Sequence, residues 1–228
     1  MLKELKALWR DGTIMSDAVR TLARMVADAS YVYGHAWEVC TGQAVKDAIA
    51  REIREHDKAV NRGEREVRRM LVEHLSINPG KDASGCLAVM IMAKDVERIG
   101  DHARNIFGVG MRLDSPITDY RLFGQLDRIQ KAVGKHLPKL ERAILDSDEA
   151  AVDEILTNYQ EIKKQVKDAQ SSLFEGEMES REAVNSTLLT RFLMRINAHV
   201  GNAASGVVFP LENIDFVSRG LRKKEEAR

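Results

Sequence analysis

Two acidic side chains, Glu97 and Asp101, stand four residues apart in a segment that is otherwise apolar on nearly every side. At this spacing both carboxylates project from one face of a helix, where like charges repel each other by about 0.2–0.5 kcal/mol. The pair therefore needs cations. These could be the nearby Lys94, Arg98 and Arg104, or a bound metal ion, and both interpretations stay open at this stage.

A second polar set lies on the apolar stripe of the preceding segment. Asp57 and Glu64 each stand at helical spacing between apolar residues, and Asn61 lies between them. A carboxylate on a stripe that faces a core is costly unless it is paired or coordinated. The stripe predicts either a groove lined by arginine and water or a cation site. Oxygen ligands from the two sets would suit Mg, Mn or Fe. The predicted metal ligands are Asp57, Asn61, Glu97 and Asp101.

Helical spacing of apolar residues dominates the whole chain, and no window shows the alternation that is typical of a strand. The six expected helices run from a cap at Ser16 or Asp17 to Gly42, from about Ile49 to Asn78, from Asp82 or Ser84 to about Met111, and over about 118–146, 148–174 and 184–209. Pro138 lies inside the fourth of them and predicts a kink or a helix boundary there.

An internal repeat divides these helices into two halves. The segment Val96–Ile106 reappears 97 residues later as Leu193–Ala203. We therefore predict an all-α fold with six long helices in two repeated antiparallel three-helix bundles. The expected parts are an amphipathic N-terminal segment (1–14), the first repeat (15–114), a second repeat with a degenerate acidic motif (115–216) and a polar tail (217–228).

The repeat places His102 and His199 at matching positions. We favour two structurally equivalent histidines that bond across the bundle interior over a pair of metal ligands. Cys40 and Cys86 both lie in apolar helical sequence. They are expected to be small buried thiols, and two cysteines suit a reducing cytosol better than a disulfide framework.

The composition excludes several classes of function. Lys and Arg number 35, as do Asp and Glu, and aromatic residues make up 5% of the chain, which argues against a nucleic-acid partner. The longest apolar run, Cys86–Ala93, is too short to cross a membrane. The chain also lacks a phosphate-binding glycine loop, a Gly-x-Ser-x-Gly motif and the paired Glu-x-x-His motifs of di-iron bundles. We expect a cytoplasmic protein without a catalytic site.

The segment Asp95–Ile106, with its Glu-Arg-Ile-Gly-Asp-His run, resembles the signature of the PhoU family. That family carries an acid-x-x-x-Asp motif once in each of two three-helix bundles. Asp57 resembles the start of the family's second-helix acidic motif, with Asn61 where an aspartate is usual. Asp82 matches the aspartate that precedes the third helix. The resemblance spans roughly residues 15–210.

This resemblance implies a regulator and not an enzyme. Proteins of the family restrain phosphate uptake through membrane transporters and communicate phosphate status to a sensor histidine kinase. Some hold metal clusters on the acidic motifs, and many form homodimers. The expected function is thus a regulatory adaptor that docks on a phosphate transporter, a kinase or both, peripherally at the inner face of the membrane. The alternatives are a metal-binding bundle for storage or redox chemistry and a purely structural dimerisation module.

The second repeat departs from the family pattern. Met194 and Ala198 stand where the first repeat has Glu97 and Asp101. A strict 97-residue offset would pair the acidic set of the first repeat with Glu154, Asn158 and Glu161. The apolar stripe of the fifth helix favours another register, in which Tyr159 takes the place of Asp57. We therefore expect no second acidic site.

Overall fold

The computed structural model describes residues 13–80, 82–175 and 177–215, which form seven α-helices and two short 3-10 turns, with no strand among them. The helices are α2 (Ile14–Cys40), α3 (Lys46–Ile77), α4 (Ala83–Arg112), α5 (Phe123–Gly134), α6 (His136–Asp146), α7 (Glu149–Glu175) and α8 (Ser180–Val208). The 3-10 turns are η1 (Ile117–Asp119) and η2 (Leu211–Asn213).

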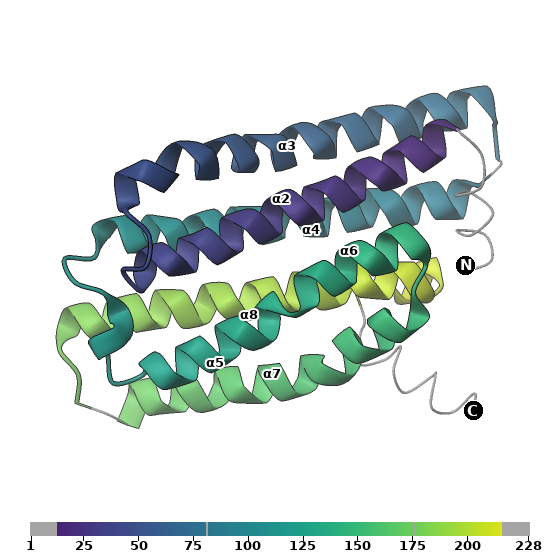
Figure 1. Cartoon of the computed structure of the whole chain (residues 1–228). Helices are drawn as coiled ribbons and strands as arrows, with labels where there is room; N and C mark the ends of the chain where they lie inside the picture. Colours follow the sequence, from purple (N-terminus) through teal and green to yellow (C-terminus); the bar gives the residue numbers. More distant parts are fainter. Residues whose placement is uncertain (1–12, 81, 176, 216–228) are drawn as a thin grey trace.

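The helices lie roughly parallel or antiparallel in two layers (Figure 1). Helices α2, α3 and α4 pack on one another, and α5 to α8 form the other group. The groups meet mainly where α4 packs on α8 and α2 packs on α6. The predicted all-α fold, with two antiparallel bundles, is confirmed.

The helix ends follow local chemistry, and one predicted cap is wrong. Helix α2 begins after Thr13, whose side-chain oxygen accepts the N–H of Ser16, so Ser16 and Asp17 lie in the first turn instead of capping it. The predicted ends at Gly42 and Asn78 are confirmed. Gly42 has a φ of +75°, which glycine adopts without strain.

The fourth predicted helix is interrupted, as Pro138 indicated. Proline has no N–H to donate to the carbonyl of Gly134 four residues earlier, and its ring crowds that carbonyl. Helix α5 accordingly ends at Gly134, and α6 begins at His136. The predicted start near residue 118 is replaced by the turn η1, and α5 itself starts at Phe123. The sixth predicted helix begins at Ser180, four residues before the expected position.

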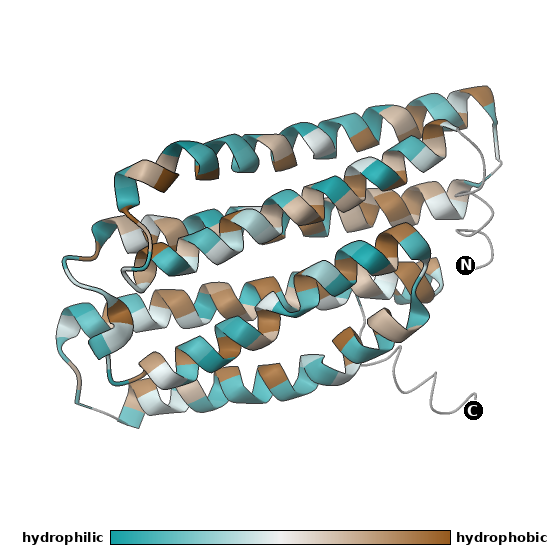
Figure 2. Cartoon of the chain, viewed as in Figure 1, coloured by the Kyte–Doolittle hydropathy of each residue, from teal (hydrophilic) through white to brown (hydrophobic). Residues whose placement is uncertain are grey.

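One continuous apolar core runs through both bundles. Figure 2 shows the amphipathic character of α3, whose hydrophobic residues lie mostly on the side that faces the other helices. Cys40 and Cys86 are buried and free, as predicted. Burial raises the pKa of the Cys40 thiol to about 12 and that of Cys86 to about 11, so neither thiol is ionised near neutral pH.

The predicted polar tail lies outside the described residues, as does nearly all of the predicted amphipathic N-terminal segment. None of the helices in the described part of the chain combines the length and the apolar character needed to span a membrane.

Candidate functional site

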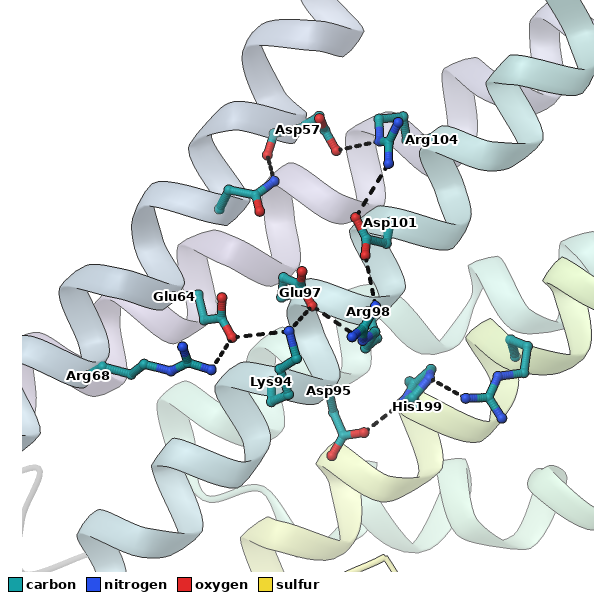
Figure 3. Close-up of polar contacts among 12 residues, drawn as sticks. Asp57, Glu64, Arg68, Lys94, Asp95, Glu97, Arg98, Asp101, Arg104 and His199 are labelled. Carbon is teal, nitrogen blue, oxygen red and sulfur yellow. Dashed lines mark hydrogen bonds and ion pairs between the residues drawn. The ribbon is translucent and has the colours of Figure 1, made fainter.

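The packing of α3 against α4 brings the two predicted acidic sets together (Figure 3). Glu64 on α3 and Glu97 on α4 are buried, with residue exposures of 7% and 8%. The side chains of Asp57 and Asp101 are 17% and 24% exposed. Four carboxylates therefore share one interface between two helices, where water screens them only in part.

Two arginines of α4 hold the aspartates. Arg104 Nε lies 3.3 Å from Asp57 Oδ1, and its Nη2 lies 3.7 Å from Asp101 Oδ1. Arg98 Nη1 lies 3.2 Å from Asp101 Oδ2, while its Nε lies 3.6 Å from Glu97 Oε2. Arg104 of α4 thus contacts Asp57 of α3 and connects the two helices. Arg98 connects Glu97 with Asp101, which both lie on α4.

Lys94 and Arg68 hold the glutamates. Lys94 Nζ lies 2.7 Å from Glu97 Oε2 and 3.5 Å from Glu64 Oε1, so it bridges the two helices as well. Arg68 Nη2 lies 2.6 Å from Glu64 Oε1. Acids and cations thereby alternate along the interface, and we call this chain of contacts the ion-pair ladder. Its order is Asp57, Arg104, Asp101, Arg98, Glu97, Lys94, Glu64 and Arg68.

Burial and neighbouring charges both act on the carboxyl group of Asp57. Burial raises the pKa of its carboxyl group, the Arg104 guanidinium opposes the shift, and the negative charges of Asp101 and Glu97 add to it. The carboxylates of the two helices are thus close enough to influence one another, which the spacing of the sequence had led us to expect.

The ladder fits ion pairing better than metal ligation. The oxygen donors are of the type that Mg, Mn or Fe accept, but each carboxylate already contacts a cation. Asn61 donates its side-chain N–H to the backbone oxygen of Asp57 on its own helix. Within the described part of the chain, no group of three His, Cys, Asp or Glu side chains is placed to hold a metal ion. The metal set of Asp57, Asn61, Glu97 and Asp101 remains a prediction.

The sequence pattern did not predict two polar contacts, those of Arg68 and Asp95. Arg68 stands four residues after Glu64, a spacing that is typical of a helical ion pair. Asp95 lies only two residues before Glu97, yet two helical steps turn it towards α8. There Asp95 Oδ1 lies 2.8 Å from His199 Nδ1, and both residues are nearly buried.

The matched histidines meet at the contact between α4 and α8, but they do not bond to each other. The rings of His102 and His199 stack, with centroids 5.6 Å apart and an interplanar angle of 20°. Only His199 is hydrogen-bonded across the bundles, to Asp95. Neither ring nitrogen of His102 has a hydrogen-bond partner among the described residues. The expected bonding of both histidines across the interior is thus corrected to one bond and one stacked ring.

The second bundle has no counterpart of the ladder in the described residues. Gly201 occupies the repeat position of Arg104, and a Cβ added there would lie 3.0 Å from Tyr159 Cδ2. Asn197 Nδ2 also donates to the backbone oxygen of Tyr159. Tyr159 therefore faces α8 where Asp57 faces α4, which supports the register indicated by the apolar stripe.

Comparisons with known proteins agree with this geometry. The arrangement is that of an all-α protein of two bundles with an acidic motif in the first, and residues 38–108 match the family model for the PhoU domain. The structure of PhoU from Pseudomonas aeruginosa superposes with a TM-score of 0.76 at 21% identity and covers 91% of this chain and 98% of its own. The phosphate transport system regulatory protein PhoU from Streptococcus pneumoniae gives 0.68 at 18% identity, with 88% and 97% covered.

A comparison with curated proteins finds no match. The resemblance to the PhoU family is nevertheless confirmed, because residues 38–108 match the PhoU domain model and the chain has the fold of the two PhoU structures. The matched range includes all of α3 and most of α4, and hence the whole ion-pair ladder.

Replacing Arg104 with methionine should destabilise the protein, because Asp57 loses its cation and Asp101 keeps only Arg98. We expect the free energy of unfolding at pH 7 to fall by about 1–2 kcal/mol, a value reduced for solvent screening of a half-exposed arginine. Adding Asp57→Asn should recover part of the loss in urea unfolding experiments. Arg51→Met, which breaks an exposed pair on the same bundle, is the matched control; an equal effect at both positions would contradict the role of Arg104.

His102 should make the protein less stable in mild acid. Burial, followed by the charges of His199 and Arg195, lowers its pKa from 6.5 to about 4. Between these values the unfolded chain binds a proton that the folded chain does not, so stability falls as the pH drops through this window. After reduction for partial exposure, the loss due to His102 is about 1–2 kcal/mol.

The His102→Gln variant should therefore lose less stability than the wild type between pH 6.5 and 4, as measured by urea unfolding at several pH values. The same substitution at His35, on the surface side of α2, is the control. Parallel stability profiles for His102→Gln and the wild type would refute this contribution.

Proposed function

We propose that this protein regulates phosphate transport by docking on a membrane phosphate transporter. The observation that carries the proposal is the PhoU-domain match, because it covers the helices that build the ion-pair ladder. The likeness to a phosphate transport system regulatory protein over most of the chain supports the same role.

The chemistry of the ladder favours binding over catalysis. A general acid or base must exchange protons with a substrate within hydrogen-bond reach. Here each of the four acids is held by at least one lysine or arginine. The half-exposed cations form a polar surface that a partner can contact with little rearrangement. We infer a non-enzymatic adaptor.

The adaptor acts, in this proposal, in the cytoplasm and peripherally at the inner face of the membrane. It restrains the transporter when phosphate is plentiful and passes phosphate status to a sensor histidine kinase. A homodimer would present two such surfaces to one membrane complex, which raises the effective concentration of the second contact.

Deleting the coding region should change phosphate uptake or phosphate-responsive expression several-fold, measured with labelled phosphate and a reporter at low and high phosphate. Wild-type protein should restore both.

A Glu97→Ala, Asp101→Ala variant should fail to restore uptake and expression at equal protein level, whereas Glu55→Ala on the exposed side of α3 should restore them. Unchanged uptake and expression on deletion would refute the regulatory role. Full function in the double variant would favour a purely structural module.

Metal binding is a second candidate, favoured by the partly buried Asp57, whose pKa is raised by burial first and then by the negative charges of Asp101 and Glu97. A bound cation would supply the positive charge that Arg104 gives in this structure. Elemental analysis of protein purified without chelator should then find stoichiometric Fe, Mg or Mn, and the Glu97→Ala, Asp101→Ala variant should lose it. Substoichiometric metal that is unaffected by the double substitution would exclude storage or redox chemistry at this site.

A further inference from the structure

Glu154, Asn158 and Glu161 of α7 repeat the spacing of Asp57, Asn61 and Glu64 on α3. They do not face α8, the helix that corresponds to α4. The register that places Tyr159 against Gly201 turns them away from α8. They line instead a pocket of about 270 Å³ between α7 and the junction of α5 with α6. Figure 1 shows these two helices running alongside α7. The pocket residues that matter are Lys135, His136, Lys139, Glu154, Asn158 and Glu161.

The pocket depends on the interruption of the helix before Pro138. Lys135 is the residue between α5 and α6, and His136 opens α6. Lys135 and Lys139 stand one helical turn apart, so both can project towards the same side of the junction. One wall of the pocket is therefore basic, and the α7 wall, with Glu154 and Glu161, is acidic.

One charge on each wall is left without an ionic partner within the described ranges. Lys139 forms an ion pair with Glu154 across the pocket. Glu161 accepts a hydrogen bond from the Gln165 side chain at 3.3 Å, but no described lysine or arginine pairs with it. Lys135 likewise makes no ion pair with a described carboxylate. The pocket thus offers one available ammonium group and one available carboxylate.

His136 adds a neutral polar group to the inner wall. The residue is 3% exposed, and its Nδ1 has no hydrogen-bond partner among the described residues. Burial, with a further contribution from Lys139, lowers the pKa of the imidazole against the opposing charge of Glu154, which favours the neutral ring. Buried polar atoms without a partner are uncommon in folded proteins, which marks this position for a role beyond packing.

The charge pattern selects the kind of ligand. A free phosphate ion would meet the carboxylates of Glu154 and Glu161, and a metal cation would meet two lysines. A molecule with one negative and one positive group avoids both repulsions. The volume lies just below the roughly 300–1,000 Å³ of sites for drug-sized ligands, and so suits a molecule of amino-acid size.

We propose that this pocket binds a free α-amino acid, with its carboxylate towards Lys135 and its ammonium group towards Glu161. The amide oxygen of Asn158 is available as a further acceptor, because its N–H group is donated to the backbone of Glu154. The site lies in the second bundle and does not depend on the regulation of phosphate transport or on the ladder.

Isothermal titration of the full chain with each of the twenty common L-amino acids tests the proposal. At least one should bind one-to-one with a Kd below about 1 mM. Lys135→Met and Glu161→Gln should each weaken that binding at least tenfold. Lys164→Met and Glu175→Gln, on α7 outside the pocket, should leave it unchanged, and circular dichroism should show the wild-type helix content in all four variants.

Two derivatives of the best-binding amino acid test whether the pocket recognises both charges of the ligand or only one of them. Its N-acetyl form lacks the ammonium group and its carboxamide lacks the carboxylate, and each should bind at least tenfold more weakly than the parent. Inorganic phosphate alone should give no saturable heat. The proposal is overturned if no amino acid binds at 10 mM, if binding survives both pocket substitutions, or if either derivative matches the parent.

Discussion

Charge balance between α3 and α4 is the constraint on which the first bundle depends. Four carboxylates lie at an interface where an isolated charge would be strongly unfavourable, and four cations neutralise them. Arg104 and Lys94 matter most, because each reaches acids on both helices. The buried apolar stripe of α3, with Ile53, Val60, Val67 and Leu71, selects which face of the helix meets α4. The ladder reinforces this rotation, because another one would separate the acids from their cations.

The same helix α4 also builds the contact with the second bundle. Glu97 and Asp101 lie towards Asp57 of α3, while Asp95 and His102 face α8 (Figure 3). Gly100, between them, lets Val60 of α3 approach closely. A rotation of α4 would consequently disturb both sides at once. The orientation of α4 is therefore fixed by contacts with both bundles.

Periodicity in the sequence was sufficient to predict the helices, the repeat and the meeting of the acidic sets, because burial of apolar stripes decides all three. It could not predict that Thr13 caps α2, since Ser16 and Asp17 are equally good capping types and only backbone geometry separates them. It also missed Asp95, because this acid stands outside the four-residue spacing of Glu97 and Asp101, and spacing alone does not reveal that it faces α8. The choice between ion pairs and a metal depends on side-chain positions that spacing leaves open.

The presence of Tyr159 and Gly201 where the first repeat has Asp57 and Arg104 makes an acidic site difficult to build in the second bundle. Tyr159 now packs in the space that an arginine at position 201 would need. Introducing either charge first would leave it unpaired between helices, which typically costs a few kcal/mol, and Met194 and Ala198 would have to change as well. The two halves therefore share the arrangement of their helices but differ in what lies between them. Where the first half has charged side chains, the second has the ring of Tyr159 against the backbone of Gly201.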